Sequence, residues 1–318
     1  MAASDPEAFD VVVLGAGLRG LAAALHRRRD RPHARLLVVD AAPQPGGTVR
    51  TVRTNGFVCE LGPFAFAASE LDPIGALLPN SPARVACSET ARHGHLYSSG
   101  GLIRVAVDPL PWTFRTGNEE LVQACRRELG TTLRLGRAVV AIDRRERFLV
   151  TLGGEAPSIL TADELVIALP DDVAGRLLGR FDPALPEVVA RLQHEGASMV
   201  WFGGDRGEAP ELTGYGIVPE PGLSTPVREA IFCSEVFAGR ALPGRFLVRL
   251  EVTRGDHEPE ADLLAKTETA LRAWTGTRAT LGLGKVHPFT TLATDAAAIE
   301  LRLRLRELPQ RVPGLQLA

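Results

Sequence analysis

Residues 11–20, VVVLGAGLRG, are followed by LLVVD at 36–40, PGGTVRT at 45–51 and GFVCELGP at 56–63. The first stretch joins a short apolar run, which is typical of a strand buried on both faces, to a Gly-rich turn. Apolar residues then recur at helical spacing, and a second apolar run ends in Asp40. Asp40 can accept two hydrogen bonds from the hydroxyls of an unphosphorylated ribose. This order of strand, turn, helix, strand and acid predicts a Rossmann-like α/β unit that binds an adenine dinucleotide.

The residues of the Gly-rich turn have separate physical tasks. Gly15 permits the tight turn, Gly17 lets the backbone approach a pyrophosphate, and Gly20 lets the helix lie close on the strand. The free N–H groups at the start of the helix would meet the phosphates, so Ala16 and Leu18 are also predicted to contact the nucleotide. The alternative is a plain structural βαβ unit, because glycines also mark ordinary turns.

The composition is that of an ordinary globular protein of about two domains, with 318 residues, 45% of them apolar and 23% charged. The formal net charge of −2 and the pI of about 6.4 give no reason to expect nucleic acid as a partner. The sequence contains no run of the ~18 apolar residues that a transmembrane helix needs. Its first ten residues lack the basic and apolar regions of a signal peptide. We therefore expect a cytoplasmic protein without a transmembrane segment.

The cysteines and histidines form no recognisable site. The four cysteines are scattered and include no C-x-x-C, which argues against a zinc site or a disulfide framework. His93 and His95 form H-x-H without a third ligand nearby in the sequence, so a solvated loop pair is favoured and no metal site is predicted. The sequence also lacks a Ser/His/Asp or Cys/His constellation, and no catalytic residue is predicted.

Beyond residue 63 the sequence predicts further helices and strands. Residues 67–116 carry several prolines and no long amphipathic pattern, so loops and short strands are expected there. Asn118 is a good N-cap for the helix that follows it. The LRLRLR run at 301–306 could alternate as a strand, but the apolar spacing around it favours a helix. The predicted helices cover 118–130, 171–178, 263–274 and 295–308, and the predicted strands cover 133–142, 148–152, 165–169, 198–202, 246–252 and 315–317.

These elements favour an α/β fold in which a β-rich substrate domain is interleaved with a Rossmann-like domain. The nucleotide domain is predicted to comprise residues 1–66, 117–178 and 288–318. The substrate domain is predicted to comprise residues 67–116 and 179–287, where the composition shifts toward strands and turn signals.

The motifs after Asp40 separate flavin binding from nicotinamide binding. A nicotinamide site has no use for a second glycine pair, whereas GGTVRT at 46–51 followed by GFVCELGP at 56–63 resembles the flavin amine oxidase superfamily. Within it, GNEELVQACRRELGTTLRLGRAVVAI at 117–142 and DELVIALPDDVAGRLL at 163–178 are similar to the oxygen-dependent protoporphyrinogen and coproporphyrinogen III oxidases. The resemblance implies FAD as the cofactor, a porphyrinogen-like small molecule as the substrate and dioxygen as the electron acceptor.

The same resemblance assigns roles to the loop that contains the second glycine pair. Gly46, Gly47 and Thr48 would pass close under the pyrophosphate. Arg50 would direct guanidinium donors toward a phosphate or the ribityl chain, and an ordinary surface arginine is the alternative.

The resemblance also extends to the turn that follows. Glu60, Gly62 and Pro63 match the E-x-G-P turn of the family, whose backbone passes near the flavin ring. Phe64 follows it, where the family often has a polar or basic residue, and it is counted with the flavin-binding residues.

Three more positions match the family pattern. Val139 stands where the backbone N–H and C=O hold the adenine, although it could simply be one more sheet valine. Ala168 begins an A-x-P turn that would close over the ribose and adenine. His287, before Pro288, matches an aromatic-Pro turn near the flavin, and a structural turn is the favoured interpretation.

The sequence also departs from this family. The family has a long helical segment between the E-x-G-P turn and the helix at 118–130, whereas only about fifty residues occupy that place here. The family continues after PGLQLA, residues 313–318, with a Gly-rich turn and a helix facing the flavin. A partner chain or a second copy of the chain is therefore a candidate for completing the flavin site.

Three interpretations follow from the sequence. The first is a flavoenzyme related to the porphyrinogen oxidases of heme biosynthesis. The second is a flavin oxidoreductase that keeps the scaffold and acts on a different, smaller substrate. The third is a non-catalytic binding or assembly protein that retains the nucleotide fold.

Overall fold

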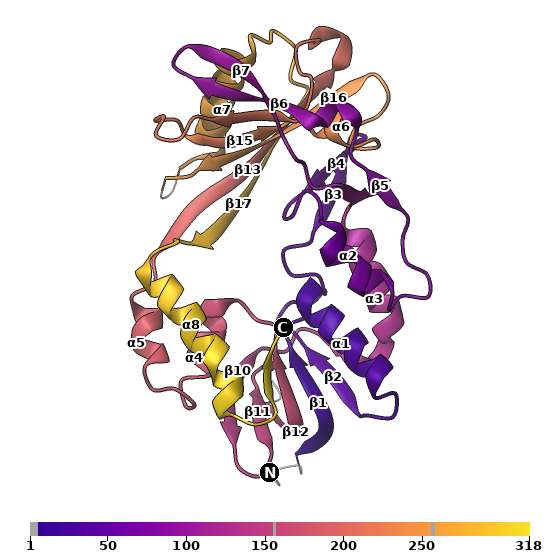
Figure 1. Ribbon diagram of the computed structural model, residues 1–318, viewed down its shortest axis with the longest axis vertical. Helices are drawn as coiled ribbons and strands as arrows, with labels where there is room; N and C mark the ends of the chain where they lie inside the picture. The colour runs from indigo at the N-terminus through magenta and orange to yellow at the C-terminus, as the bar shows by residue number, and fades with distance from the viewer. Residues whose placement is uncertain (1–5, 155–156, 256–257) are drawn as a thin grey trace.

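The computed structural model describes residues 6–154, 157–255 and 258–318, so the first five residues of the predicted nucleotide domain lie outside the described part. Two seven-stranded sheets lie at opposite ends of the long axis of the molecule (Figure 1). The long antiparallel strands β13 (His194–Asp205) and β17 (Leu283–Leu292) run from the second sheet toward the first.

The first sheet is built around β1 (Glu7–Leu14), which pairs in parallel with β2 (Leu36–Val39) and β12 (Ser158–Ile167). Residues 11–14 are fully buried, as a strand covered on both faces requires. The α/β class predicted from the sequence is confirmed. The remaining strands of this sheet are β9 (Leu133–Arg134), β10 (Val139–Arg144), β11 (Phe148–Leu152) and β18 (Leu315–Leu317).

Helices cover both faces of the first sheet (Figure 1). Successive side chains of β1 point to opposite faces, so they enter two different cores. Val11 and Val13 pack in one core, and Val12 and Leu14 pack in the other. The first core is closed by α1 (Leu18–Asp30), α2 (Ala68–Gly75) and α3 (Glu119–Leu129). The second is closed by α4 (Asp171–Leu177), α5 (Leu185–Ala190) and α8 (Ala296–Arg311).

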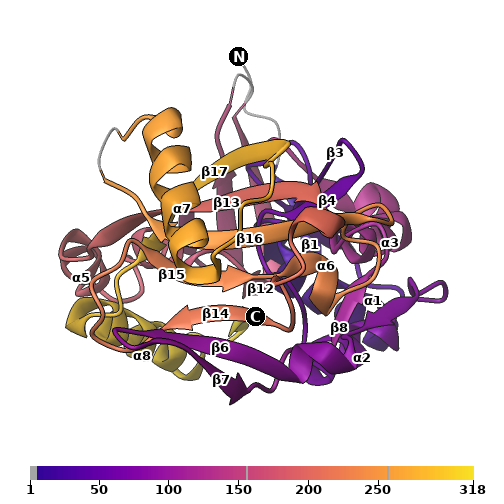
Figure 2. The same ribbon diagram turned by 90° about the horizontal axis from the view of Figure 1, so that it is seen from above.

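The second sheet is mostly antiparallel and has the order β17-β13-β16-β15-β14-β6-β7. One face packs against α7 (Glu260–Thr275), which lies over the sheet in Figure 2. The other face packs against residues from the segment 57–65. The other strands are β6 (His93–Ser98), β7 (Gly101–Ala106), β14 (Gly216–Pro219), β15 (Val227–Ile231) and β16 (Arg245–Thr253).

Five short elements belong to neither seven-stranded sheet. They are β3 (Thr51–Thr54), β4 (Phe57–Glu60), β5 (Arg84–Ala86), β8 (Trp112–Phe114) and α6 (Cys233–Val236), which packs on β16 of the second sheet. The expectation of loops and short strands over 67–116 is confirmed, since α2 has only eight residues. The division into two domains stays a proposal, and α5 packs with α4 and α8 on the first sheet although it falls in the predicted substrate segment.

The predicted strand at 133–142 is wrong as a single element. The chain leaves β9 at Arg134 and begins β10 at Val139, and these strands lie on opposite sides of the first sheet. Gly136, with a φ of 70°, bends the backbone between them. The helices predicted at 118–130, 171–178, 263–274 and 295–308 are confirmed within a few residues.

Two predicted loops are strands instead. His287 and Pro288 lie inside β17, opposite Met199 and Ser198 of β13, rather than in a turn. Proline is tolerated there because β17 is an edge strand and the missing N–H interrupts no second ladder. His93 and His95 belong to β6, so the interpretation as a loop pair is wrong.

Candidate functional site

The turn from β1 to α1 is shaped by glycines that have no room for a side chain. A Cβ on Gly15, whose φ is 101°, would overlap the carbonyl oxygen of Ala168. A Cβ on Gly20 would overlap the carbonyl oxygen of Gly15. The helix therefore lies directly on the end of the strand, as the sequence predicted.

The N-terminus of α1 is open to a ligand. Gly17 is its N-cap, no side chain caps the helix, and its first turn contains no acidic residue. A Cβ on Gly17 would meet no atom within 4 Å, so this glycine borders open space. Gly17 forms an isolated bridge to Gly46, whose N–H donates to the Ala16 carbonyl at 2.7 Å. Uncapped N–H groups and the helix dipole together make an anion-binding position.

Asp40 lies beside this turn at the end of β2. Its Oδ2 accepts a hydrogen bond from the Ala16 N–H at 2.6 Å, and its Oδ1 accepts one from the Ala42 N–H at 2.7 Å. A carboxylate has about four acceptor positions, so two remain for ribose hydroxyls. The structure therefore brings Asp40 into the predicted site and gives it a second task, that of fixing the turn.

The loop with the second glycine pair lies against both neighbouring turns. Gly46 and Gly47 both have positive φ, at 118° and 58°. A Cβ on Gly62 would overlap the carbonyl oxygen of Thr48, which brings the E-x-G-P segment directly against the glycine loop. Arg50 donates to the side chain and carbonyl of Gln44 at 3.1 and 3.0 Å and to the Gly47 carbonyl at 3.3 Å. Its guanidinium thus braces the loop, with two N–H groups left over.

The turn at 15–18, Asp40 and the loops at 46–48 and 62–63 form a cradle, and the other two predicted positions follow or begin strands on the β12 side of β1. Ala168 accepts close packing from Gly15 and Gly20, which puts it next to the pyrophosphate turn. Val139 begins β10, two residues after Arg137, whose backbone N–H donates to the Asp40 carbonyl at 2.9 Å. Ala168, Asp40 and the glycine turn therefore meet at the carboxyl end of β1, and Arg137 ties the segment that leads to Val139 to the same place.

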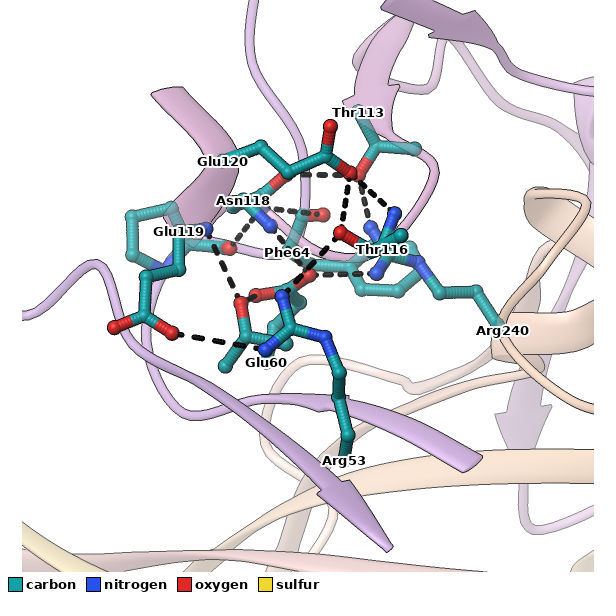
Figure 3. Close-up of polar contacts among 11 residues, drawn as sticks. Arg53, Glu60, Phe64, Thr113, Thr116, Asn118, Glu119, Glu120 and Arg240 are labelled. Carbon is teal, nitrogen blue, oxygen red and sulfur yellow. Dashed lines mark hydrogen bonds and ion pairs between the residues drawn. The ribbon is translucent and has the colours of Figure 1, made fainter. Parts of the chain in front are cut away.

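A buried polar cluster holds the E-x-G-P turn from behind (Figure 3). Glu60 and Arg240 form an ion pair of 2.6 Å with both side chains fully buried. The Glu60 carboxylate also accepts from the Thr51 hydroxyl at 2.8 Å and from the Asn118 N–H at 2.9 Å. Arg240 donates in addition to the Thr113 hydroxyl. Burial raises the pKa of Glu60, and the charge of Arg240 opposes this rise.

Asn118 has a different task from the one predicted. It stands at the N-cap position of α3, but its side chain makes no cap bond. Its Nδ2 donates to the carbonyls of Pro63 and Phe64 at 2.7 and 3.1 Å instead. Thr51 takes over part of the capping, because its hydroxyl accepts from the Glu119 N–H at 3.2 Å. Asn118 therefore fixes the backbone of the turn predicted to face the flavin.

Phe64 turns its ring into the core of this cluster. The ring lies 5.9 Å from the Arg240 guanidinium and 5.8 Å from that of Arg249, and 5.4 Å from the ring of Phe237. Each guanidinium lies within the distance of about 6 Å at which the attraction between a cation and an aromatic ring is favourable. This packing gives a physical reason for an apolar residue at a position where the resembling family often has a polar one.

A pocket of about 330 Å³ opens between this turn and the second sheet. Its polar lining includes Tyr215, Glu229 and Arg249, none of which the sequence predicted. The signal that could have found Arg249 is the alternation of β16, where a charged residue stands between buried apolar ones. Periodicity shows that such a side chain is unusual but not which distant residues it meets.

The described residues contain no group of three or more His, Cys, Asp or Glu side chains that could hold a metal ion. The four cysteines are free. Burial raises the pKa of Cys59, Cys125 and Cys233 to about 12 each, so these thiols stay protonated at neutral pH. In the described part of the chain, no helix has the length and apolar character needed to cross a bilayer.

Two known protein families match overlapping segments of the chain. Residues 13–78 match the NAD(P)-binding Rossmann-like domain, and residues 64–295 match the flavin containing amine oxidoreductases. The second match covers most of the sequence. The chain belongs to the flavin containing amine oxidoreductase family. The flavin superfamily inferred from residues 46–63 is therefore confirmed.

Curated relatives of this flavin oxidoreductase match over short stretches. Coproporphyrinogen III oxidase of Bacillus subtilis is 37% identical over 60 residues, and that of Staphylococcus aureus is 32% identical over 56 residues. Each match covers 18% of this chain and only 13% and 12% of the respective relative.

Solved structures match over nearly the whole chain at low identity. A candidate protoporphyrinogen oxidase from Exiguobacterium sp. 255-15 aligns with a TM-score of 0.79 at 18% identity, over 100% of this chain and 94% of the other. Reduced UDP-galactopyranose mutase aligns with a TM-score of 0.76 at 13% identity, over 97% and 89%. These likenesses establish the fold.

FAD is the cofactor of this family member, and the cradle fits it. The uncapped start of α1 offers N–H donors for the pyrophosphate, Asp40 retains acceptor positions for ribose, and Gly17 leaves space beside both. The turn of Gly62 and Pro63 closes the cradle toward the second sheet.

Proposed function

We propose that this protein is an FAD-dependent oxidoreductase that oxidises a porphyrinogen with dioxygen as the electron acceptor. The observation that carries the flavin assignment is the open N-terminus of α1, with Asp40 on one side and the Gly62 turn on the other. The names of the curated relatives support a porphyrinogen as the substrate. The cytoplasm is the proposed location.

The chain and the cofactor divide the chemistry between them. Bound FAD would supply the redox chemistry, the transfer of two electrons and two protons from the substrate to dioxygen with hydrogen peroxide as the product. The N–H groups of α1 would hold the pyrophosphate and Asp40 would hold the ribose. The cluster of Glu60, Arg240 and Asn118 holds the turn at 62–64 in one conformation and excludes water behind it. No side chain is assigned as an acid or base.

A smaller substrate is the second candidate, and the pocket beside Phe64 favours it. Its volume of about 330 Å³ is at the low end of the ~300–1,000 Å³ usual for small-molecule sites. The common fold hosts proteins named UDP-galactopyranose mutase and putrescine oxidase as well as oxidases of porphyrinogens. A non-catalytic binding protein is the third candidate.

The experiment begins with the cofactor. The purified protein is denatured, and the released chromophore is measured by its flavin absorption. Saturating FAD should raise the melting temperature, and NAD should leave it unchanged. A rise with NAD alone would contradict the flavin assignment.

The FAD-loaded protein is then given coproporphyrinogen III or protoporphyrinogen IX, and porphyrin fluorescence and hydrogen peroxide are followed. Turnover supports the first candidate. Bound FAD with peroxide formed only from small amines or acids supports the second, and bound FAD without any turnover supports the third. Light scattering of the same sample tests the proposal that a second copy or partner chain completes the flavin site.

A further inference from the structure

The pocket beside Phe64 is walled by two parts of the molecule. One wall is the segment Pro63–Ala65, which the proposed function places near the flavin ring. The other is the inner face of the second sheet, with Glu229 and Ile231 on β15 and Arg249 on β16. The pocket therefore lies where a substrate would be expected.

Arg249 is a buried cation whose charge is not matched by an ion pair. Its exposure is 7%, and its Nη1 has no hydrogen-bond partner. Its Nε donates at 3.1 Å to the sulfur of Met199, which is a weak acceptor. Among the described residues no carboxylate oxygen lies within 4.0 Å of this guanidinium. A buried charge without a partner is strongly unfavourable, so an anionic ligand would stabilise it.

Arg240 and Arg249 differ in how the charge of the guanidinium group is compensated. Both guanidinium groups lie against the Phe64 ring, at 5.9 and 5.8 Å. Arg240 is neutralised by Glu60 at 2.6 Å, whereas Arg249 forms no ion pair with a described carboxylate within 4.0 Å. The two arginines are thus matched in packing and differ in charge compensation. Arg249, not Arg240, lines the pocket.

The surroundings of Arg249 hold its guanidinium in place. Its register partners are Trp201 on β13 and Ile231 on β15, and both are buried. Paired residues of neighbouring strands share one face of a sheet, so the guanidinium emerges between two apolar side chains. Such a planar fork matches a carboxylate through two parallel hydrogen bonds.

Two acids line the same pocket, Glu70 and Glu229, and they restrict the charge of the ligand. Glu229 accepts a hydrogen bond from the Tyr215 hydroxyl at 3.3 Å. Burial raises the pKa of Glu229, and the charge of Arg249 lowers it. A phosphate dianion would meet repulsion from an ionised Glu229 that a carboxylate, with a single charge, meets less strongly.

We propose that Arg249 binds a carboxylate group of the substrate in this pocket, which makes the substrate of the proposed oxidoreductase a carboxylic acid. This inference rests on the proposed function for the role of the pocket. A small monocarboxylate and a propionate arm of a porphyrinogen carry the same group, so the experiment uses a probe for each.

The FAD-loaded protein is titrated with benzoate, benzamide, phenyl phosphate and coproporphyrin III, and binding is measured by calorimetry and by the visible spectrum of the flavin. Benzoate or coproporphyrin III should bind saturably. Benzamide has the same shape without the charge and should bind at least tenfold more weakly than benzoate. Phenyl phosphate binding as tightly as benzoate would overturn the assignment to a carboxylate.

Substitution then locates the site. Arg249→Met should abolish carboxylate binding, and Arg249→Lys, which keeps the charge without the fork, should weaken it about tenfold. The control is Arg228→Met, which removes a positive charge on the same sheet from an arginine that pairs with Glu195 at 2.8 Å. It should bind benzoate like the unaltered protein.

Failure of either carboxylate probe to bind the unaltered protein would overturn the inference. Equal binding in a folded Arg249→Met or Arg249→Lys variant would do the same. If Arg249→Met does not fold, the lysine variant and the comparison of benzoate with benzamide still test whether Arg249 binds a carboxylate. Protein that carries no flavin would contradict the proposed function instead. Calorimetric titration of that protein and of its Arg249 variants with benzoate would still test the inference.

Discussion

The cradle at the start of α1 and the cluster around Glu60 are adjacent, but the first consists mainly of backbone groups and the second of side chains. The cradle consists of backbone: uncapped N–H groups, carbonyls and glycines within residues 15–62, with Asp40 as its main side chain. The cluster consists of side chains from distant segments, and its ion pair joins residues 180 positions apart. A backbone site depends on the absence of side chains, and a side-chain site depends on each partner being present.

This difference predicts different responses to mutation. In the cradle, adding one methyl group should prevent folding at a glycine that is packed against backbone and should leave folding unchanged at a glycine that borders open space. In the cluster, losing one charge should leave its partner buried and unpaired. The following predictions test these expectations in order of decreasing effect.

The largest effect is expected at Gly20. Gly20→Ala would place a methyl group on the Gly15 carbonyl oxygen, so helix and strand must separate. We expect a loss of more than about 4 kcal/mol of folding free energy, and little folded protein. Denaturant unfolding followed by circular dichroism measures it.

Gly17→Ala is the matched control, since its methyl group enters open space. It should fold normally and weaken FAD binding at least about tenfold, or ~1.4 kcal/mol. Normal stability of Gly20→Ala would show that the turn is not packed as described.

Arg240→Met should have the second largest effect. It leaves the Glu60 carboxylate buried without its ion-pair partner, which costs about 3–5 kcal/mol. Burial already raises the pKa of Glu60 in the fold, and removal of Arg240 raises it further. Stability of the variant is therefore greatest below the unfolded pKa of about 4.3 and falls as the pH rises toward and through the folded pKa.

The measurement is the melting temperature of Arg240→Met and of the unaltered protein at pH 5 and pH 8, with a larger deficit expected at pH 8. Adding Glu60→Gln to the variant should recover part of the stability and remove this pH dependence. A deficit that is the same at both values of pH would exclude an unpaired Glu60 as its cause.

Asp40→Ala should weaken FAD binding without unfolding the protein. A hydrogen bond to a charged group contributes about 1.5–3 kcal/mol, which corresponds to a tenfold to hundredfold loss of affinity. The variant also loses the acceptors for Ala16 and Ala42, so a small decrease in melting temperature accompanies it. Calorimetric titration with FAD measures the affinity, with Asp40→Asn as the conservative control. Unchanged affinity in the alanine variant would remove Asp40 from the site.

The smallest effect is expected at Arg50. Its three hydrogen bonds go to Gln44 and Gly47 on the surface of the loop, so Arg50→Met should reduce FAD affinity by no more than about fivefold, or ~1 kcal/mol. The same calorimetric titration applies. A loss of more than tenfold would mean that the guanidinium leaves the loop and binds a phosphate, as the family resemblance implies.

The amino-acid sequence by itself determined the parts of this protein that depend on neighbouring residues. Glycine spacing at 15–20, the acid at 40 and the apolar periodicity of the helices all act locally, and the structure agrees with them. The second glycine pair likewise identified a flavin protein before any fold was known, and the family match agrees.

Only the tertiary structure decided which distant residues meet. It divided the strand at 133–142 between two sides of a sheet, because Gly136 bends there and each half finds a different partner. It also assigned Asn118 to the turn at Pro63, paired Arg240 with Glu60 and left the Nη1 of Arg249 without a hydrogen-bond partner. Pairing across the chain depends on how the sheets pack, and a one-dimensional pattern carries no information about that packing.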